Sequence, residues 1–234
     1  MNRDNINLKG MDYMFKKAYT EEAVKEAASK YAMDVFGKKF DDEITVYRVT
    51  PRTMFSKFDY ILMNSKNMPG STITLRRGSK EDVSCDYMEV YYREMHIRPM
   101  VEDYFRNLWG DICIIFNCAD HAYGPVNPNL TLDEFMKKTG VSFDIFVKEE
   151  DFEKSGKDLY EKEVLRFMEE AKEKGWKYNR ITVGVYDNIP SEKVNGTEQF
   201  KIKWEDTCKQ LEYADFFLSE NGLIEHKEWT LTAK

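Results

Sequence analysis

The chain has 234 residues, of which 42% are hydrophobic and 33% are charged, and this composition is typical of a folded globular protein rather than a fibrous or disordered one. Its 35 Lys and Arg residues are outnumbered by 42 Asp and Glu residues, which gives a net charge of −7 and counts against nucleic acid as the main partner, because binding to phosphates depends on basic surface. A chain of this length can bury roughly 70% of the surface that its unfolded form exposes, so folding requires neither a disulfide nor a structural metal.

The apolar segments are too short to cross a membrane. They run for about five residues, as in 112–116, whereas a membrane-spanning helix needs roughly 20. The first ten residues are polar and lack the apolar stretch of a signal peptide. The sequence as written therefore predicts a cytoplasmic protein without a transmembrane segment. The alternative is an extracytoplasmic protein from which a signal segment has been removed.

The cysteines indicate neither a disulfide framework nor a metal site. No two of them form a C-x-x-C pair, and they are sparse for a chain of this length. We therefore expect free thiols, no bound metal and no cofactor. The four residues are Cys85, Cys113, Cys118 and Cys208.

The first part of the chain predicts a helix packed on an antiparallel sheet. Residues 1–19 are expected to form a polar N-terminal segment, followed by an α+β unit over residues 20–125. Thr20 is followed by glutamates and by apolar residues three or four positions apart, which predicts an amphipathic helix that ends at Gly37. Extended segments joined by short turns then predict an antiparallel meander. The predicted strands are residues 43–49, 57–63, 71–77 and 82–92.

This unit continues with a helix and a buried strand. Pro99 suits the first turn of a helix that ends at Gly110, and the apolar run 112–116 predicts the strand. The helix is expected to face the core with Met100, Val101, Tyr104, Phe105 and Leu108.

The second α+β unit is predicted over residues 126–234. Thr131 and Glu134 match a capping box, which is a strong signal for a helix start. Asn221-Gly222 predicts a two-residue β-hairpin turn near the end of the chain. Between them we expect strands at 141–147, 181–185 and 200–204, and a helix at 158–174 that buries Tyr160, Val164, Leu165, Met168 and Ala171.

The predicted elements place a helix before a meander twice. A helix cradled by a four-stranded antiparallel sheet resembles the cystatin-like arrangement, and because this resemblance concerns the order of elements alone, it implies no activity. The sequence therefore predicts an α+β protein whose amphipathic helices pack on antiparallel meander sheets. Two cystatin-like helix-plus-sheet units in tandem are one form of this fold, and two unrelated halves are the other.

The sequence lacks the common catalytic motifs. It contains no G-x-G, G-x-x-x-x-G-K-[ST], G-x-S-x-G, H-E-x-x-H or EF-hand pattern. One loop with catalytic residue types remains, because Cys118, Asp120 and His121 follow a buried strand and could serve nucleophilic or metal chemistry. The alternative is a plain surface loop, because two metal ligands are fewer than zinc requires.

Two groups of residues are candidates for ligand binding. Tyr87, Tyr91 and Tyr92 could line a concave sheet face and stack on a peptide or sugar, or they could be packing residues. Arg76 and Arg77 could clamp a phosphate or carboxylate, or they could belong to a charged turn.

We therefore interpret the chain as a non-catalytic binding or interaction module for a protein, a peptide or a small ligand. The alternative hypothesis is a small thiol- or metal-dependent hydrolase centred on the loop of Cys118, Asp120 and His121.

Overall fold

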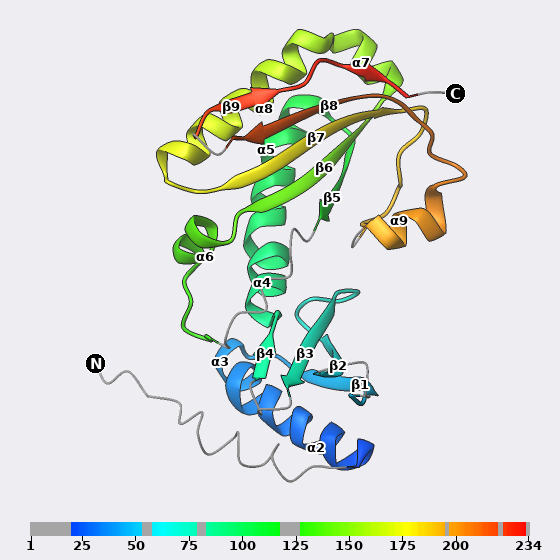
Figure 1. The fold of residues 1–234 in the computed structure, drawn as a ribbon. Helices are drawn as coiled ribbons and strands as arrows, with labels where there is room; N and C mark the ends of the chain where they lie inside the picture. Colours follow the sequence, from blue (N-terminus) through cyan, green and yellow to red (C-terminus); the bar gives the residue numbers. More distant parts are fainter. Residues whose placement is uncertain are drawn as a thin grey trace. The chain divides into compact units, whose positions relative to one another are not determined.

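The computed structural model describes residues 20–52, 58–78, 83–117, 127–194, 197–219 and 222–232. The chain divides into two compact units, each built from helices and a β-sheet (Figure 1). The first comprises the described residues of Met1–Met95 and Ala122–Leu130, and the second those of His96–His121 and Thr131–Lys234. The predicted α+β class is confirmed. The predicted domain boundaries stay a prediction, because compactness does not establish which segments fold on their own.

The first unit begins with the helix predicted from Thr20. The Oγ1 of Thr20 accepts a hydrogen bond from the backbone N–H of Ala23 (3.2 Å) and caps helix α2 (Glu21–Ala32). A π-helical segment, η1 (Met33–Gly37), and a short helix, α3 (Lys38–Phe40), extend it past the predicted end. The helix stops at Asp41, whose φ of 50° lies in the left-handed region.

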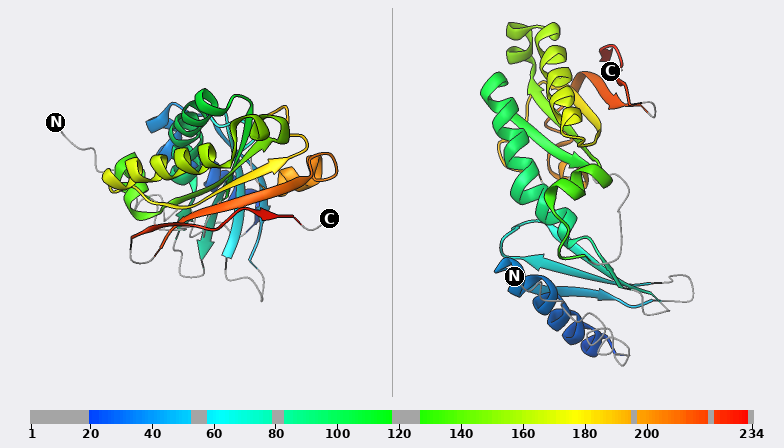
Figure 2. Two further views of the ribbon diagram at one scale, coloured as in Figure 1. Left: turned by 90° about the horizontal axis from the view of Figure 1, so that it is seen from above. Right: turned by 90° about the vertical axis from the view of Figure 1, so that its left-hand side faces the viewer.

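The sheet of the first unit is the antiparallel meander that the turns predicted. Its strands are hydrogen-bonded in chain order, and α2 lies along this sheet (Figure 2). The apolar stripe of α2 is buried. The predicted helix-on-meander arrangement is therefore confirmed for this unit. The strands are β1 (Ile44–Thr50), β2 (Phe58–Ser65), β3 (Thr72–Gly78) and β4 (Val83–Cys85).

The predicted strand at 82–92 is wrong beyond Cys85. Helix α4 (Tyr87–Tyr92) follows, then the π-helical segment η2 (Arg93–Ile97) and helix α5 (Arg98–Trp109). Buried Tyr87 and Val90 lie three residues apart, which suits one face of a helix as well as an irregular strand. The β-forming residues of this segment therefore did not decide between helix and strand.

Helix α5 buries a different stripe from the one predicted. Pro99 lies in its first turn, as predicted, although the residues before it are also helical. Val101, Phe105 and Trp109 are buried, whereas Leu108 is 45% exposed. The stripe is displaced because the indole of Trp109 packs against the ring of Phe105 (4.6 Å between centroids), which turns Leu108 outward.

The sheet of the second unit is mixed, so the predicted antiparallel meander is wrong here. The strand order is β10-β8-β7-β6-β5, with β9 also paired to β8, and β6 and β7 are parallel. The same plan is therefore not repeated in the two units. The strands are β5 (Ile112–Asn117), β6 (Val141–Lys148), β7 (Tyr178–Tyr186), β8 (Gln210–Leu218), β9 (Ile224–His226) and β10 (Thr230–Leu231).

The parallel pair results from the connection between β6 and β7. Helices α7 (Glu149–Ser155) and α8 (Lys157–Glu173) carry the chain back to the end of the sheet where β6 began. Parallel neighbours need such a crossover, whereas a hairpin produces antiparallel ones. Helix α6 (Leu132–Lys138) joins β5 to β6 and starts with the predicted capping box of Thr131 and Glu134.

One face of this sheet packs against α5, α7 and α8 (Figure 1), and part of the other face packs against α9 (Thr197–Trp204). The predicted strand at 200–204 is thus a helix. Phe200 is buried in a cluster with Phe146 and Tyr186, whereas Ile202 is 82% exposed. The alternation of apolar residues suggested a strand, but only Phe200 and its neighbour one turn later, Trp204, face the sheet.

The terminal hairpin is confirmed, although its turn is longer than predicted. Leu218 pairs with Ile224. The N–H of Ser219 donates to the carbonyl oxygen of Leu223, and the N–H of Gly222 donates to that of Ser219 (both 2.9 Å). The connection between the closing residues is therefore 220–222, and Gly222 has a φ of 79° that suits glycine. Across the described ranges, no helix is both long and apolar enough to span a bilayer.

We expect the first unit to be more stable in mild acid than in mild base, because of Asp86. This side chain is buried between β4 and α4, where it accepts a hydrogen bond from the N–H of Thr74 (2.7 Å). Burial raises the pKa of its carboxyl to about 7, above the roughly 3.9 of an unfolded chain. The folded form therefore binds the proton more tightly, and this stabilisation is lost as the pH rises from about 4 through 7.

The free energy of unfolding should consequently fall by about 2–3 kcal/mol between about pH 5 and pH 8. Hydrogen exchange of peptides from β3 and α4, measured at increasing urea concentrations and at both pH values, reports the free energy of unfolding of the first unit. Asp86→Asn keeps an oxygen for Thr74 and should remove most of the difference. An equal pH dependence in the variant and the wild type would assign the effect to another group.

Candidate functional site

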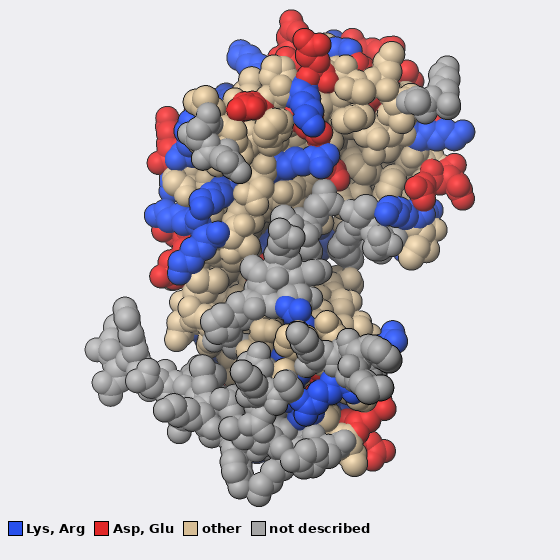
Figure 3. All heavy atoms as spheres, in the orientation of Figure 1, with Lys and Arg blue, Asp and Glu red and all other residues tan. Residues whose placement is uncertain are grey.

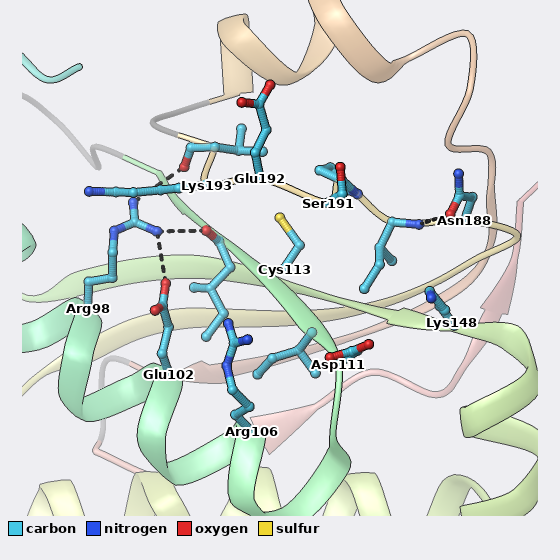
Figure 4. A pocket seen from close by; sticks show the side chains of 15 residues that line it. Arg98, Glu102, Arg106, Asp111, Cys113, Lys148, Asn188, Ser191, Glu192 and Lys193 are labelled. Atoms are coloured by element: carbon cyan, nitrogen blue, oxygen red, sulfur yellow. Dashed lines mark hydrogen bonds and ion pairs between the residues drawn. The ribbon is translucent and has the colours of Figure 1, made fainter. Parts of the chain in front are cut away.

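A cavity of about 390 Å³ lies in the second unit at the β5 edge of its sheet (Figure 4). Helix α5 forms one wall, the start of β5 forms the floor, and residues 188–194, which follow β7, form the opposite wall. This volume is within the range of small-molecule sites. The lining residues are Arg98, Glu102, Arg106, Asp111, Ile112, Cys113, Ile114, Lys148, Asn188, Ile189, Pro190, Ser191, Glu192, Lys193 and Val194.

Helix α5 contributes a stripe of charged side chains. Arg98, Glu102 and Arg106 are four residues apart and project from one side of the helix (Figure 4). The guanidinium of Arg98 is buried, donates through Nη1 to the carbonyl oxygen of Ile114 (2.9 Å) and lies 4.8 Å from the ring centroid of Phe116. Arg98 therefore holds α5 against the edge of the sheet and saturates a carbonyl group there.

The thiol of Cys113 belongs to the floor. It points into the cavity toward residues 188–194, although the residue is only 6% exposed (Figure 4). Burial raises the pKa of this thiol to about 12, and the nearby charge of Arg98 opposes the effect only in part. At neutral pH the thiol is therefore protonated and a poor nucleophile.

Two of the three carboxylates that line the cavity already have cationic partners. Glu102 pairs with Arg98 and Glu192 pairs with Lys203, each at 3.5 Å. Asp111 is the third carboxylate, and no ion pair is found for it among the described residues. Most of the negative charge of the lining is thus compensated within the protein.

Two cations at the rim lack such compensation. The side chains of Arg106 and Lys148 form no hydrogen bond or ion pair with another described residue. In Figure 4 the carboxylate of Asp111 lies between them. The rim therefore presents two positive groups and one negative group to an incoming molecule.

The described residues show no metal site, and the face of the second unit drawn in Figure 3 is not dominated by one charge. Within these residues, no three His, Cys, Asp or Glu side chains gather as ligands for a metal ion. On the face drawn in Figure 3, Lys and Arg side chains are interspersed with Asp and Glu side chains over the second unit. The cavity is thus the best-defined candidate site in the second unit.

The tyrosines that the sequence grouped lie on α4 and not on a sheet, so their predicted position is wrong. Tyr87 is fully buried, with its ring stacked on Phe36 (4.3 Å) and its hydroxyl donating to Asp42 (2.9 Å). Tyr91 stacks on Tyr87 (6.1 Å), and Tyr92 is also buried. These contacts are packing contacts, and the ligand-binding role of the three residues stays a prediction.

The two arginines lie in strand β3 and not in a turn. The Nε of Arg77 forms a buried ion pair with Asp59 (2.7 Å), which joins β3 to β2. The guanidinium of Arg76 lies 5.2 Å from the ring centroid of Phe58. Their role as an anion clamp stays a prediction. Cys118, Asp120 and His121 lie outside the described residues, so the hydrolase hypothesis also stays a prediction.

The residues that line the cavity were not predicted from the sequence. The spacing of Arg98, Glu102 and Arg106 is visible in the sequence, but such charges usually mark a solvated helix face. Arg106 lies on α5 and Lys148 lies at the end of β6. The two residues meet at one rim because α5 packs against the sheet that contains β6. A contact between segments this far apart in the chain leaves no local pattern.

The fold and the cavity define a two-unit α+β protein with a polar site in its second unit. No family model and no curated protein matches the sequence. Among solved structures, the chain is similar to the crystal structure of a DUF5037 family protein from Ruminococcus gnavus ATCC 29149. The two share 10% sequence identity, with 82% of this chain and 91% of that chain covered, at a TM-score of 0.43.

Proposed function

We propose that this protein is a non-catalytic binding module whose cavity in the second unit holds a small anionic molecule. The observation that carries the proposal is the uncompensated charge of Arg106 and Lys148 at the rim. The lining contains four cations and three carboxylates, an excess of one positive charge, in a chain whose net charge is −7. A carboxylate or phosphate group that contacts either cation would gain charge-assisted hydrogen bonds.

The carboxylate of Asp111 restricts which anionic molecules can bind in the cavity. A molecule that carries only negative charge would be repelled by Asp111, whereas an ammonium or hydroxyl group on the same molecule would donate a hydrogen bond to it. Amino acids and hydroxy acids combine these groups. The volume of about 390 Å³ admits molecules of that size.

Binding without catalysis is supported by the protonation of the thiol. Cys113 is the only nucleophilic thiol of the described lining, and its pKa of about 12 keeps it protonated at neutral pH. The described lining also contains no imidazole that could accept its proton. Recognition through fixed charges is the chemistry that these groups support.

We expect L-glutamate to bind and L-glutamine, which differs by one charge, to bind at least about tenfold more weakly. Isothermal titration calorimetry at low salt measures both affinities. Arg106→Gln and Lys148→Gln should each weaken glutamate binding about tenfold, which is the loss of roughly one charge-assisted hydrogen bond. Salt should weaken binding in the wild type, because rim charges are screened.

Lys162→Gln is the matched control, since Lys162 is an exposed cation on α8 that does not line the cavity. It should bind glutamate like the wild type. Equal affinity for glutamate and glutamine, or unchanged binding in both rim variants, would reject the proposed function.

A further inference from the structure

The second unit has a polar hollow on the face of its sheet that α5 and α8 do not cover. Along β6 and β7, Phe143, Ile145, Ile181 and Val183 are buried on the helix side, and the residues between them face the other way. Where α9 ends, a hollow of about 370 Å³ remains. Its polar lining consists of Asp144, Arg180, Thr182, Gln210, Tyr213 and Asp215.

An ion pair between the buried Asp215 and Arg180, whose side chain is 55% exposed, lines this hollow and leaves hydrogen-bonding groups unused. The Oδ1 of Asp215 accepts hydrogen bonds from the Nε of Arg180 (2.9 Å) and the hydroxyl of Thr182 (2.8 Å), and the Nη2 of Arg180 lies 2.8 Å away. Asp215 is 8% exposed. In the described part of the chain, its Oδ2 and the Nη1 of Arg180 have no partner. One acceptor and one donor that line the hollow are thus left for a ligand.

Gly184, in the lining of the hollow, leaves room for the side chains of Tyr186 and Gln210. A Cβ on Gly184 would lie 2.7 Å from Cε2 of Tyr186 and 3.0 Å from the side-chain nitrogen of Gln210. The ring of Tyr186 stacks on Phe146 (4.2 Å between centroids, 24° between planes) and fills this space. The hollow therefore has an aromatic surface at one end, with Tyr213 opposite Gly184 on the neighbouring strand.

We infer that this hollow is a second binding site, separate from the proposed anion cavity, and that it takes a neutral polyhydroxylated molecule, namely a carbohydrate. Asp144 and Asp215 repel an anion, and Arg180 repels a cation. Hydroxyls of one sugar can satisfy both groups, because a hydroxyl can donate to the Oδ2 of Asp215 and another can accept from the Nη1 of Arg180. The aromatic end of the hollow suits the apolar face of a sugar ring.

Saturation-transfer NMR with glucose, galactose, mannose, N-acetylglucosamine, maltose and cellobiose tests this inference on the full chain. We expect at least one of these sugars to receive saturation from the protein. Arg180→Gln should reduce the affinity for that sugar at least about tenfold. Tyr213→Phe removes only a hydroxyl from the lining and should weaken binding without disturbing the fold.

The control variants are Arg166→Gln on α8, whose side chain is 61% exposed, and Arg106→Gln in the other cavity. Both should bind the sugar like the wild type, so failure of the anion proposal leaves this test unaffected. The inference is overturned if none of the six sugars binds. It is also overturned if a sugar binds equally well to the wild type, Arg180→Gln and Tyr213→Phe.

Discussion

Replacing Val164 with aspartate is expected to cost the second unit about 3–5 kcal/mol of its free energy of unfolding. Val164 is completely buried on the face of α8 that packs against the sheet. A carboxylate at this position would lie among apolar side chains without a partner, and burying an unpaired charge is among the most destabilising changes that a single mutation can make. Urea unfolding monitored by tryptophan fluorescence measures the effect.

Fluorescence is specific for the second unit, because Trp109, Trp176, Trp204 and Trp229 all belong to it. Leu165→Asp is the matched control, since Leu165 is the next residue and only half-buried. Its carboxylate can reach water, so we expect a loss at most half as large. If both variants unfold at the same urea concentration, Val164 does not face the sheet.

Replacing Asp42 with alanine is expected to destabilise the first unit by about 3–5 kcal/mol. Its buried carboxylate accepts hydrogen bonds from the hydroxyls of Ser65 (2.6 Å) and Tyr87 (2.9 Å) and from the N–H of Asn67 (3.1 Å). These bonds join the end of α3 to the end of β2 and to α4. Alanine would leave several buried donors without an acceptor, and each such group costs about 1–3 kcal/mol.

Hydrogen exchange of peptides from β2 and α4 measures this loss within the first unit. Asp41→Asn is the control, because Asp41 is exposed and its φ of 50° is also accessible to asparagine. The control should retain the stability of the wild type. A loss of less than about 1 kcal/mol in Asp42→Ala would show that the hydroxyls find other acceptors.

Helix caps and turn residues in the sequence correctly predicted where several helices and one hairpin begin or turn. Thr20 and Thr131 are helix caps as predicted, and the residues around Gly222 form the terminal hairpin. In each case the responsible groups lie within about four residues of one another, so the chain itself brings them together. The antiparallel meander of the first unit was also predictable, because short turns leave neighbouring strands few other ways to pair.

The spacing of apolar residues gave wrong predictions where the same spacing suits both a helix and a strand. Residues 87–92 and 200–204 are helical although both were predicted as strands. In a short segment, apolar residues at every second position include pairs four apart, which also share a helix face. Which face is buried depends on the element that packs against it, and this element lies far away in the sequence.

The sequence by itself therefore determined the α+β class, most of the helices and strands, and the absence of long apolar segments. The tertiary structure decided that β6 and β7 are parallel, that Arg106 and Lys148 share a rim, and that Arg180 on β7 pairs with Asp215 on the neighbouring strand β8. The physical reason is the range of the interactions. Caps and turns involve near neighbours, whereas strand order and both candidate sites depend on the burial of segments that meet only in the folded chain.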